Sequence, residues 1–183
     1  MNPNIEPGFA IWLTGLPASG KTTLAHALRP RLLAFGRPVQ VLDSDELRGT
    51  LTPQPSYSPH ERDWFYEMLV FLAELLTRNG VNVLIAATAA RRAYREVARA
   101  RLKRFAEIYV DCPPDACRDR DPKGLWQRAD RGEIDDFPGV GTPYEPSDNP
   151  DVRADTNRFS TDEAVQQIMD ALGRQGFFAA GEN

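Results

Sequence analysis

Residues 15 to 22 read Gly15-Leu16-Pro17-Ala18-Ser19-Gly20-Lys21-Thr22, which matches the pattern G-x-x-x-x-G-K-[ST] at every fixed position. An apolar run at residues 9–13 precedes this stretch and a helical pattern follows it, which is the context of a phosphate-binding loop. Gly15 and Gly20 permit backbone angles that turn successive N–H groups inward, at the positive end of the following helix. The stretch predicts a loop that binds a nucleoside triphosphate; the alternative is a tightly packed glycine turn that binds nothing.

The loop ends in side chains that suit phosphate and magnesium. Lys21 is predicted to reach the β- and γ-phosphates of the nucleotide as a mobile point charge, and the Thr22 hydroxyl is predicted to bind Mg²⁺. Thr23 belongs to the helical pattern, and we include it among the residues expected to contact the nucleotide.

Length and composition indicate one globular domain spanning residues 1–183. The chain has 183 residues, of which 42% are hydrophobic, and is therefore long enough to bury a core. Its net charge of −4 argues against a nucleic-acid-binding surface that covers the whole protein. The sequence has neither an apolar run approaching 18 residues nor a charged-then-apolar N-terminus, so neither a membrane span nor a secretory signal is expected. We expect a cytoplasmic protein with a small-molecule partner.

The cysteines and histidines do not suggest a metal centre. Cys112, Cys117, His26 and His60 lack metal-ligand spacing, so a structural zinc site is not expected. The two cysteines are expected to be packed thiols.

Strand-like and helix-like patterns alternate along the chain. β-rich runs occur at residues 9–14, 39–43, 81–87 and 105–111, each followed by a loop and helical periodicity. This alternation predicts the α/β fold of P-loop nucleoside-triphosphate hydrolases, with a parallel sheet covered by helices on both faces.

Two helices carry clear boundary signals. Residues 59–78 follow Ser58 in a capping-box pattern with Glu61, and residues 161–172 follow Ser160 in the same pattern with Glu163. The first helix is expected to bury an apolar face, and residues 174–183 are expected to form a frayed tail. The members of that face are Phe65, Met68, Leu69, Leu72 and Leu76.

Two stretches predict irregular structure. Residues 49–59 are rich in proline and are expected to form an ordered loop. Residues 122–151 have no clear period, and a segment of that length in a compact domain is usually a lid or is disordered. Its aromatic residues Trp126, Phe137 and Tyr144 favour a lid, which we place at about residues 120–151.

Carboxylates follow the second predicted strand. Asp43, Ser44 and Asp45 lie where ligands bind in open parallel sheets, beyond the carboxyl ends of the strands. Asp43 is a candidate Mg²⁺ ligand, and both aspartates are candidates for accepting a proton from an attacking hydroxyl or orienting it. The alternative is that Asp43 only caps the next helix.

Together these residues make the chain resemble the adenylylsulfate kinase family. The resemblance spans nearly the whole chain, and its most particular part is the series of motifs in the predicted lid. The matching stretches are residues 11–22, 42–45 with Arg48, 57–59 with Arg62, 110–113 through Cys117, 120–121, 123–126, 132–134, Phe137 and 144–146. The resemblance implies that the protein uses ATP and Mg²⁺ to phosphorylate the 3′-hydroxyl of adenosine 5′-phosphosulfate. It also suggests a homodimer.

The resemblance implies a role for each matching position. The catalytic residues would be Lys21, Asp43 and Asp45. The metal would be bound by Thr22 and Asp43, and ATP would be bound by residues 15–23 with Arg120. The residues implied for the acceptor nucleotide are Asp45, Arg48, Tyr57, Arg62, Arg92, Lys123, Leu125 and Phe137. Tyr57 stands where the family has a phenylalanine that stacks on adenine. Which aspartate is the base stays open.

Departures from the family pattern lie toward the acceptor. They are Phe65, Glu67, Ala89, Ala90, Arg91 and Asp130. The basic run 91–104 is typical of a solvated face, but its first turn, with Arg91, Arg92 and Arg95, is a candidate anion-binding fork near the acceptor. Two alternatives therefore remain open: a related kinase for a hydroxyl of another nucleotide, sugar or natural product, and a non-catalytic ATP sensor.

Overall fold

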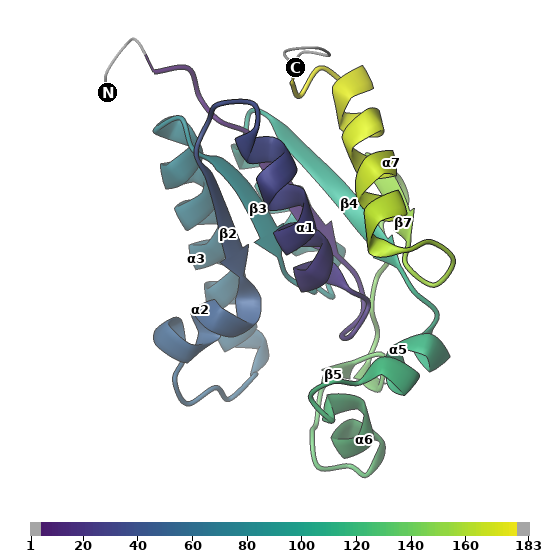
Figure 1. Cartoon of the computed structure of the whole chain (residues 1–183). Coiled ribbons are helices and arrows are strands. Elements are labelled where there is room, and N and C mark those ends of the chain that lie inside the picture. The colour runs from purple at the N-terminus through teal and green to yellow at the C-terminus, as the bar shows by residue number, and fades with distance from the viewer. Residues whose placement is uncertain (1–4, 179–183) are drawn as a thin grey trace.

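The computed structural model describes residues 5–178, which form one parallel sheet between two layers of helices, with a smaller lobe beyond one edge (Figure 1). The strands are β1 (Ala10–Thr14), β2 (Val39–Asp43), β3 (Asn82–Ala86), β4 (Phe105–Asp111), β5 (Phe137–Pro138), β6 (Gly141–Thr142) and β7 (Val152–Asp155). The helices are α1 (Lys21–Leu33), α2 (Ser44–Leu51), α3 (Pro59–Arg78), α4 (Arg92–Arg101), α5 (Pro114–Arg120), α6 (Leu125–Asp130) and α7 (Thr161–Arg174).

The main sheet has the strand order β2-β3-β1-β4-β7, and every pair in it is parallel. β1 therefore lies in the centre, with Ile11 opposite Leu84 of β3 and Ala106 of β4. Because all five strands run the same way, their carboxyl ends meet at one edge, and the loops that follow them converge there. The predicted fold class is confirmed.

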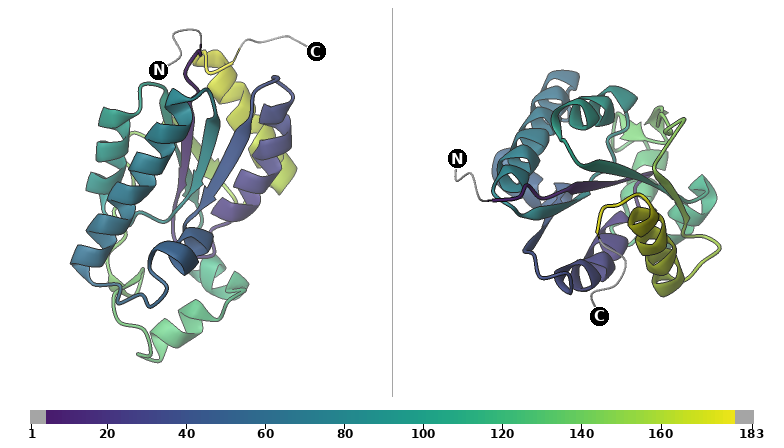
Figure 2. Two further views of the ribbon diagram at one scale, coloured as in Figure 1. Left: turned by 90° about the vertical axis from the view of Figure 1, so that its left-hand side faces the viewer. Right: turned by 90° about the horizontal axis from the view of Figure 1, so that it is seen from above.

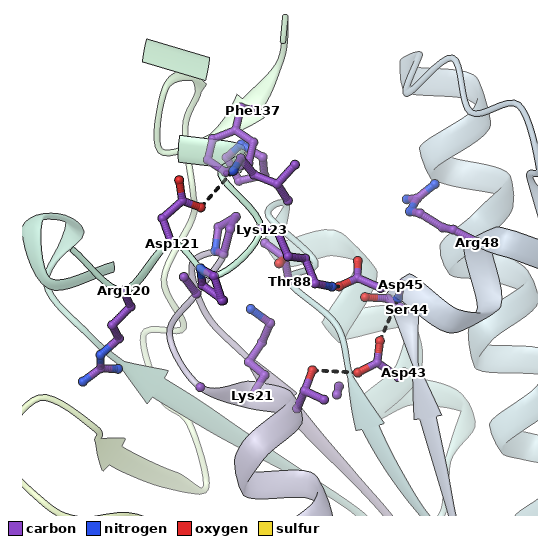
Figure 3. Close-up of a pocket in the computed structure, with 18 of the residues that line it drawn as sticks. Lys21, Asp43, Ser44, Asp45, Arg48, Thr88, Arg120, Asp121, Lys123 and Phe137 are labelled. Atoms are coloured by element: carbon purple, nitrogen blue, oxygen red, sulfur yellow. Dashed lines mark hydrogen bonds and ion pairs between the residues drawn. The ribbon is translucent and has the colours of Figure 1, made fainter. Parts of the chain in front are cut away.

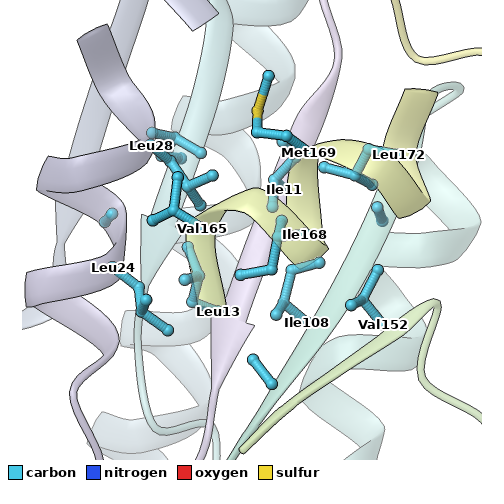
Figure 4. Close-up of a cluster of buried hydrophobic side chains, with 14 of the residues drawn as sticks. Ile11, Leu13, Leu24, Leu28, Ile108, Val152, Val165, Ile168, Met169 and Leu172 are labelled. Carbon is cyan, nitrogen blue, oxygen red and sulfur yellow. The ribbon is translucent and has the colours of Figure 1, made fainter. Parts of the chain in front are cut away.

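Helices cover both faces of the sheet, as the view from above shows (Figure 2). Alternate residues of β1 point to opposite faces: Ile11 and Leu13 pack beneath α1 and α7, whereas Trp12 packs beneath α3 and α4. Figure 4 shows the first of these layers, where Ile168 of α7 lies among Ile11, Ile108 and other buried side chains. Burial on both faces explains why the strands read as continuous apolar runs.

The helix boundaries follow the predicted capping signals. Ser160 and Glu163 form a complete capping box at the start of α7. At α3, Ser58 accepts a hydrogen bond from the Glu61 amide, but the Glu61 carboxylate accepts from the Ser56 and Tyr57 amides instead of that of Ser58. Glu61 therefore ties the preceding loop to the helix.

The buried face of α3 differs from the predicted one. The fully buried apolar residues are Phe65, Tyr66, Leu69, Val70 and Ala73, while Met68, Leu72 and Leu76 are only half-buried. Apolar residues run almost all round this helix, so periodicity alone did not determine which face meets the sheet.

Three predicted irregular segments contain more structure than expected. Residues 49–51 belong to α2 rather than to the loop, and α7 continues to Arg174. Phe178 stacks on Phe35 with ring centroids 4.6 Å apart and Phe177 meets Phe9 edge to face, so these two aromatic residues of the predicted tail are packed. Residues 179–183 lie outside the described range. The predicted lid, residues 120–151, contains α6 and the two-stranded sheet β5–β6.

The lid has a small apolar core of its own. Trp126 and Phe137 meet edge to face at 5.1 Å, and Cys112, Cys117 and Ala129 are buried with them. Both cysteines are free thiols, as predicted. Gly139 has a φ of +98°, and a Cβ there would lie 2.7 Å from the Trp126 ring, so only glycine fits beside this aromatic pair. Leu16 and Ala18 of the phosphate loop pack against the same cluster.

Ile168→Ala is expected to lower the free energy of unfolding by about 3 kcal/mol, because it leaves a cavity in the fully buried layer between α7 and the sheet. Val97→Ala is the matched control, since Val97 is 44% exposed and its truncation should change stability by less than about 0.5 kcal/mol. Urea denaturation of both variants measures the difference, and equal effects would contradict the assigned packing.

Candidate active site

A cavity of about 1180 Å³ lies at the carboxyl ends of the strands. The phosphate loop and the start of α1 form its floor, α2 and α3 form one wall, and the lid lies across it (Figure 3). Segments that are distant in sequence therefore meet in one hollow, as the convergence of parallel strand ends requires.

The phosphate loop has the backbone that its glycines predict. Gly15 and Gly20 have φ values of +152° and +100°, and a Cβ on Gly15 would lie 2.5 Å from the Val110 carbonyl oxygen. Lys21 begins α1 and folds back over the loop, where its Nζ donates to the carbonyl oxygens of Gly15 at 3.1 Å and Leu16 at 2.7 Å. The ammonium group is thus held at the mouth of the anion cradle.

Burial sets the charge behaviour of Lys21. Loss of solvent lowers the pKa of its ammonium group from 10.5 to about 8, although the nearby carboxylates of Asp45 and Asp43 oppose the shift. A phosphate group would replace the lost solvation and favour the charged form.

Asp43 caps α2, as one interpretation of the sequence expected, and it also contacts the phosphate-loop side of the cavity. Its Oδ1 accepts the amide of Asp45 at 2.8 Å and caps α2, while its Oδ2 accepts the Thr22 hydroxyl at 2.6 Å. One carboxylate therefore fixes the start of α2 and faces the phosphate loop.

The Thr22–Asp43 pair fits a magnesium ion by its chemistry. Hydroxyl and carboxylate oxygens are the ligands that Mg²⁺ prefers, and in phosphotransfer sites one or two protein oxygens suffice because phosphates and water complete the shell. Residues 5–178 contain no group of three or more His, Cys, Asp or Glu side chains that could hold a metal ion.

An ion pair joins the lid to α2 across the cavity. Lys123 Nζ lies 2.5 Å from Asp45 Oδ2. The hydrogen bond to Asp45 raises the pKa of Lys123, so the two lysines of the site shift in opposite directions. Both side chains of the pair are more than half exposed, so solvent screens the pair and a ligand can displace it at small cost.

Three residues predicted to bind the acceptor, Arg48, Tyr57 and Arg62, lie on the α2–α3 wall. The Arg48 guanidinium lies 3.9 Å from the centre of the Phe65 ring and 5.1 Å from that of Tyr57. Arg62 donates to the Tyr57 carbonyl at 2.8 Å and, across the cavity, to the Asp136 carbonyl of the lid at 2.6 Å. Arginine on an aromatic face is a rigid platform for an anionic or planar ligand.

Arg120 lies at the other end of the cavity. Its guanidinium donates to the Thr156 hydroxyl at 3.2 Å and carbonyl at 2.5 Å, and Thr156 in turn donates to the Ser19 carbonyl at 2.8 Å. Thr156 follows β7, and Phe159 lines the cavity close by in sequence. Sequence reasoning missed both, although a strand-end rule applied to β7 would have indicated them.

Most predicted site residues line the cavity, and four within the described range do not. Gly15, Leu16 and Ser19 contribute loop backbone behind the surface. Arg92 is a correction: it donates to the Pro146 carbonyl at 3.2 Å and pairs with Asp148, so its charge is directed to residues 146–148 of the lid and not to the cavity. Thr88 and Tyr66, which the site prediction omitted, line the wall.

The predicted anion-binding fork of α4 is also corrected. Arg91 pairs with Asp63 on the surface, and Arg95 is only 1% exposed and lies against Glu107 of β4. None of the three arginines of this turn lines the cavity of residues 5–178.

The departures from the family pattern lie outside the cavity lining. Glu67 pairs with Arg101 of α4 and Asp130 pairs with Arg118, both on the outer surface. Phe65 and Ala89 are fully buried behind Arg48 and Tyr66. Within the described range, the cavity lining includes none of the six departing positions.

Comparison with known proteins agrees with this geometry. A family model described as adenylylsulphate kinase matches residues 7–155. The chain belongs to this family. An adenylyl-sulfate kinase of Rippkaea orientalis is 40% identical over 174 residues, which cover 95% of this chain and 96% of the relative.

Solved structures give the same family. An APS kinase of Mycobacterium tuberculosis in complex with AMPPNP and APS superimposes with a TM-score of 0.84 at 36% identity, over 91% of this chain and 98% of that one. A shikimate kinase of Aquifex aeolicus, with a TM-score of 0.57 at 19% identity, shares the fold alone.

The Lys21 ammonium is expected to titrate at a pH of about 8 in the ligand-free protein. Asp45→Asn should move the pKa lower, because it removes the carboxylate that favours the charged form most. Carbon-13 shifts of the lysine side chains would measure both values, with Lys103, on the exposed surface, as an internal control. Titration of Lys21 at its ordinary value in both proteins would contradict the assigned burial.

Proposed function

We propose that this chain transfers the γ-phosphoryl group of ATP to the 3′-hydroxyl of adenosine 5′-phosphosulfate. The observation that carries the proposal is that one cavity joins a phosphate loop, two aspartates and two arginines on aromatic faces, in a chain of the adenylylsulphate kinase family. The product would be 3′-phosphoadenosine 5′-phosphosulfate, which is the activated form of sulfate.

The donor nucleotide is assigned to the phosphate-loop end of the cavity. Loop amides would hold its β- and γ-phosphates, Lys21 would neutralise them, and Arg120 and Thr23 would flank the nucleotide. Thr22 and Asp43 would hold Mg²⁺, which neutralises the charge that builds up between the phosphates during transfer. The lowered pKa of Lys21 supports this role, because a bound anion would replace the solvation that burial removes from the ammonium group.

The reacting centre is assigned to the space beside Asp43 and Asp45. Either carboxylate can orient the attacking 3′-hydroxyl and accept its proton as the new O–P bond forms and the bond to the ADP oxygen breaks. Phosphoryl transfer of this kind is accelerated mainly by positioning and charge neutralisation, so the surrounding cations matter as much as the base.

The acceptor nucleotide is assigned to the α2–α3 wall. Arg48 and Arg62 would bind its phosphosulfate, and Tyr57 would stack on its adenine in place of the family's phenylalanine. Lys123, Leu125 and Phe137 would close over both nucleotides and exclude water. Lys123 would leave Asp45 for a nucleotide oxygen, a change that their exposed ion pair permits.

A related kinase with another hydroxyl acceptor is the second candidate, favoured by the six departures. Their location outside the cavity lining supports adenylylsulfate instead. We further propose a homodimer and a cytoplasmic location. Among residues 5–178 no helix is both long and apolar enough to span a membrane.

The deciding experiment incubates the purified protein with Mg²⁺-ATP and adenosine 5′-phosphosulfate and separates the nucleotides by chromatography. We expect 3′-phosphoadenosine 5′-phosphosulfate and ADP in equal amounts. Slow ATP hydrolysis without the 3′-phosphorylated product would reject the proposal and favour the other acceptor.

Asp43→Asn is expected to lower kcat by about 10²- to 10⁴-fold and to leave ATP affinity nearly unchanged, because asparagine keeps the cap on α2 but cannot accept the proton. Asp115→Asn is the matched control, since the Asp115 side chain is 99% exposed and distant from the site. Stopped-flow turnover and calorimetric nucleotide binding measure the two effects. Unchanged turnover in Asp43→Asn would contradict the role of Asp43 as the base and would assign the proton transfer to Asp45.

A further inference from the structure

A buried arginine links α4, the sheet and the lid. Arg95 is 1% exposed, and its Nε donates to Glu107 Oε1 of β4 at 2.8 Å. Its Nη1 donates to the Ala89 carbonyl and, at 3.4 Å, to that of Arg91, while Nη2 donates to the Glu145 carbonyl at 2.5 Å. The planar guanidinium thus reaches three chain segments at once, a geometry that lysine cannot reproduce.

The return end of the lid is fixed at the same place. The Glu145 amide donates to the Ala90 carbonyl at 2.8 Å, and the Glu145 carboxylate accepts the Arg92 amide at 2.7 Å, where α4 lacks a cap from its own N-cap side chain. The Tyr144 hydroxyl lies 3.0 Å from that of Thr14 at the end of β1. Residues 144–146, which we call the return end, are therefore bonded to the core through both backbone and side chains.

The segment on the other side of Arg95 leads to the cavity. Ala89 has a φ of +45°, which is unfavourable for alanine, and its amide donates to the Tyr66 hydroxyl at 2.9 Å. Tyr66 and Thr88 both line the cavity, and the Thr88 carbonyl accepts the Thr14 hydroxyl at 2.7 Å. The Arg95–Ala89 bond therefore helps to hold an unfavourable turn directly behind the acceptor wall.

We propose that Arg95 is a positioning residue: it fixes the return end of the lid and the turn at Ala89 in one arrangement, so that the acceptor half of the cavity is formed before nucleotide binds. The proposal rests on the proposed phosphotransfer for its kinetic consequence. The opposite end of the lid, near Lys123, then closes while the return end stays in place.

The kinetic test compares Arg95→Lys with Arg101→Lys. Lysine at position 95 can keep the charge beside Glu107 but cannot also reach Ala89 and Glu145. We expect the KM for adenosine 5′-phosphosulfate to rise about tenfold, because displaced binding groups cost affinity, with the KM for ATP within about twofold of the wild type. Arg101→Lys makes the same change on the same helix, where Arg101 pairs with Glu67 and Glu74 of α3, and should leave both constants unchanged.

A second variant covers the case in which Arg95→Lys does not fold. Arg95→Met with Glu107→Met removes both charges of the buried pair, a change that is often tolerated for stability, and should raise the same KM. Folded variants with an acceptor KM within twofold of the wild type would overturn the proposal, as would an equal rise in both KM values, which a purely structural role predicts.

Hydrogen exchange tests the arrangement without kinetics. In the ligand-free wild type, the amide of Glu145 should exchange at least about tenfold more slowly than that of Val140 within the lid. Arg95→Lys should remove this difference, and Arg101→Lys should retain it. Equal exchange of the two amides in the wild type would overturn the proposal. If the wild type phosphorylates no adenylylsulfate, the proposed function fails while the exchange result still decides the role of Arg95.

Discussion

The parallel direction of the five sheet strands is the constraint on which the site depends. Every strand ends at the same edge, so each following loop must run over one common area. β1 delivers the phosphate loop, β2 delivers Asp43, β3 delivers Thr88 and β7 delivers Thr156. An apolar layer packs against each face of the sheet and makes it rigid. The strand ends can therefore hold charged side chains at fixed separations, although these side chains are not themselves packed in a core.

Single carboxylates at the strand ends contact more than one charged or polar group. One oxygen of the Asp43 carboxylate caps α2 and the other accepts the Thr22 hydroxyl. The Asp45 carboxylate favours the charged form of both lysines: it raises the pKa of Lys123 and opposes the lowering of the pKa of Lys21 by burial. Such sharing couples the phosphate loop, α2 and the lid through single side chains. Displacement of one partner by a nucleotide oxygen therefore alters the others, which is a physical basis for closure that responds to ligand.

Much of the fold was predictable because its signals are local. The bounds of β2, β4 and α3 were predicted to the residue, since apolar runs and a proline-led cap mark them. β7 was missed because Val152–Asp155 is short and half polar, as suits an edge strand, and α6 spans less than two turns. Arg95 was expected at the acceptor because a basic run suggests an exposed face; its partner Glu107 lies on another element, beyond the reach of a local pattern.

The small core of the lid has a consequence for exchanging parts between relatives. Trp126 donates through its indole nitrogen to the Pro17 carbonyl at 3.0 Å, and Leu16 and Ala18 fill the other side of the same cluster. The lid and the tip of the phosphate loop therefore share one hydrophobic cluster, although about a hundred residues separate them in the chain. A chimera with a lid taken from a relative would therefore also need that relative's residues at positions 16–18. We expect substitutions in these two distant segments to occur together among relatives.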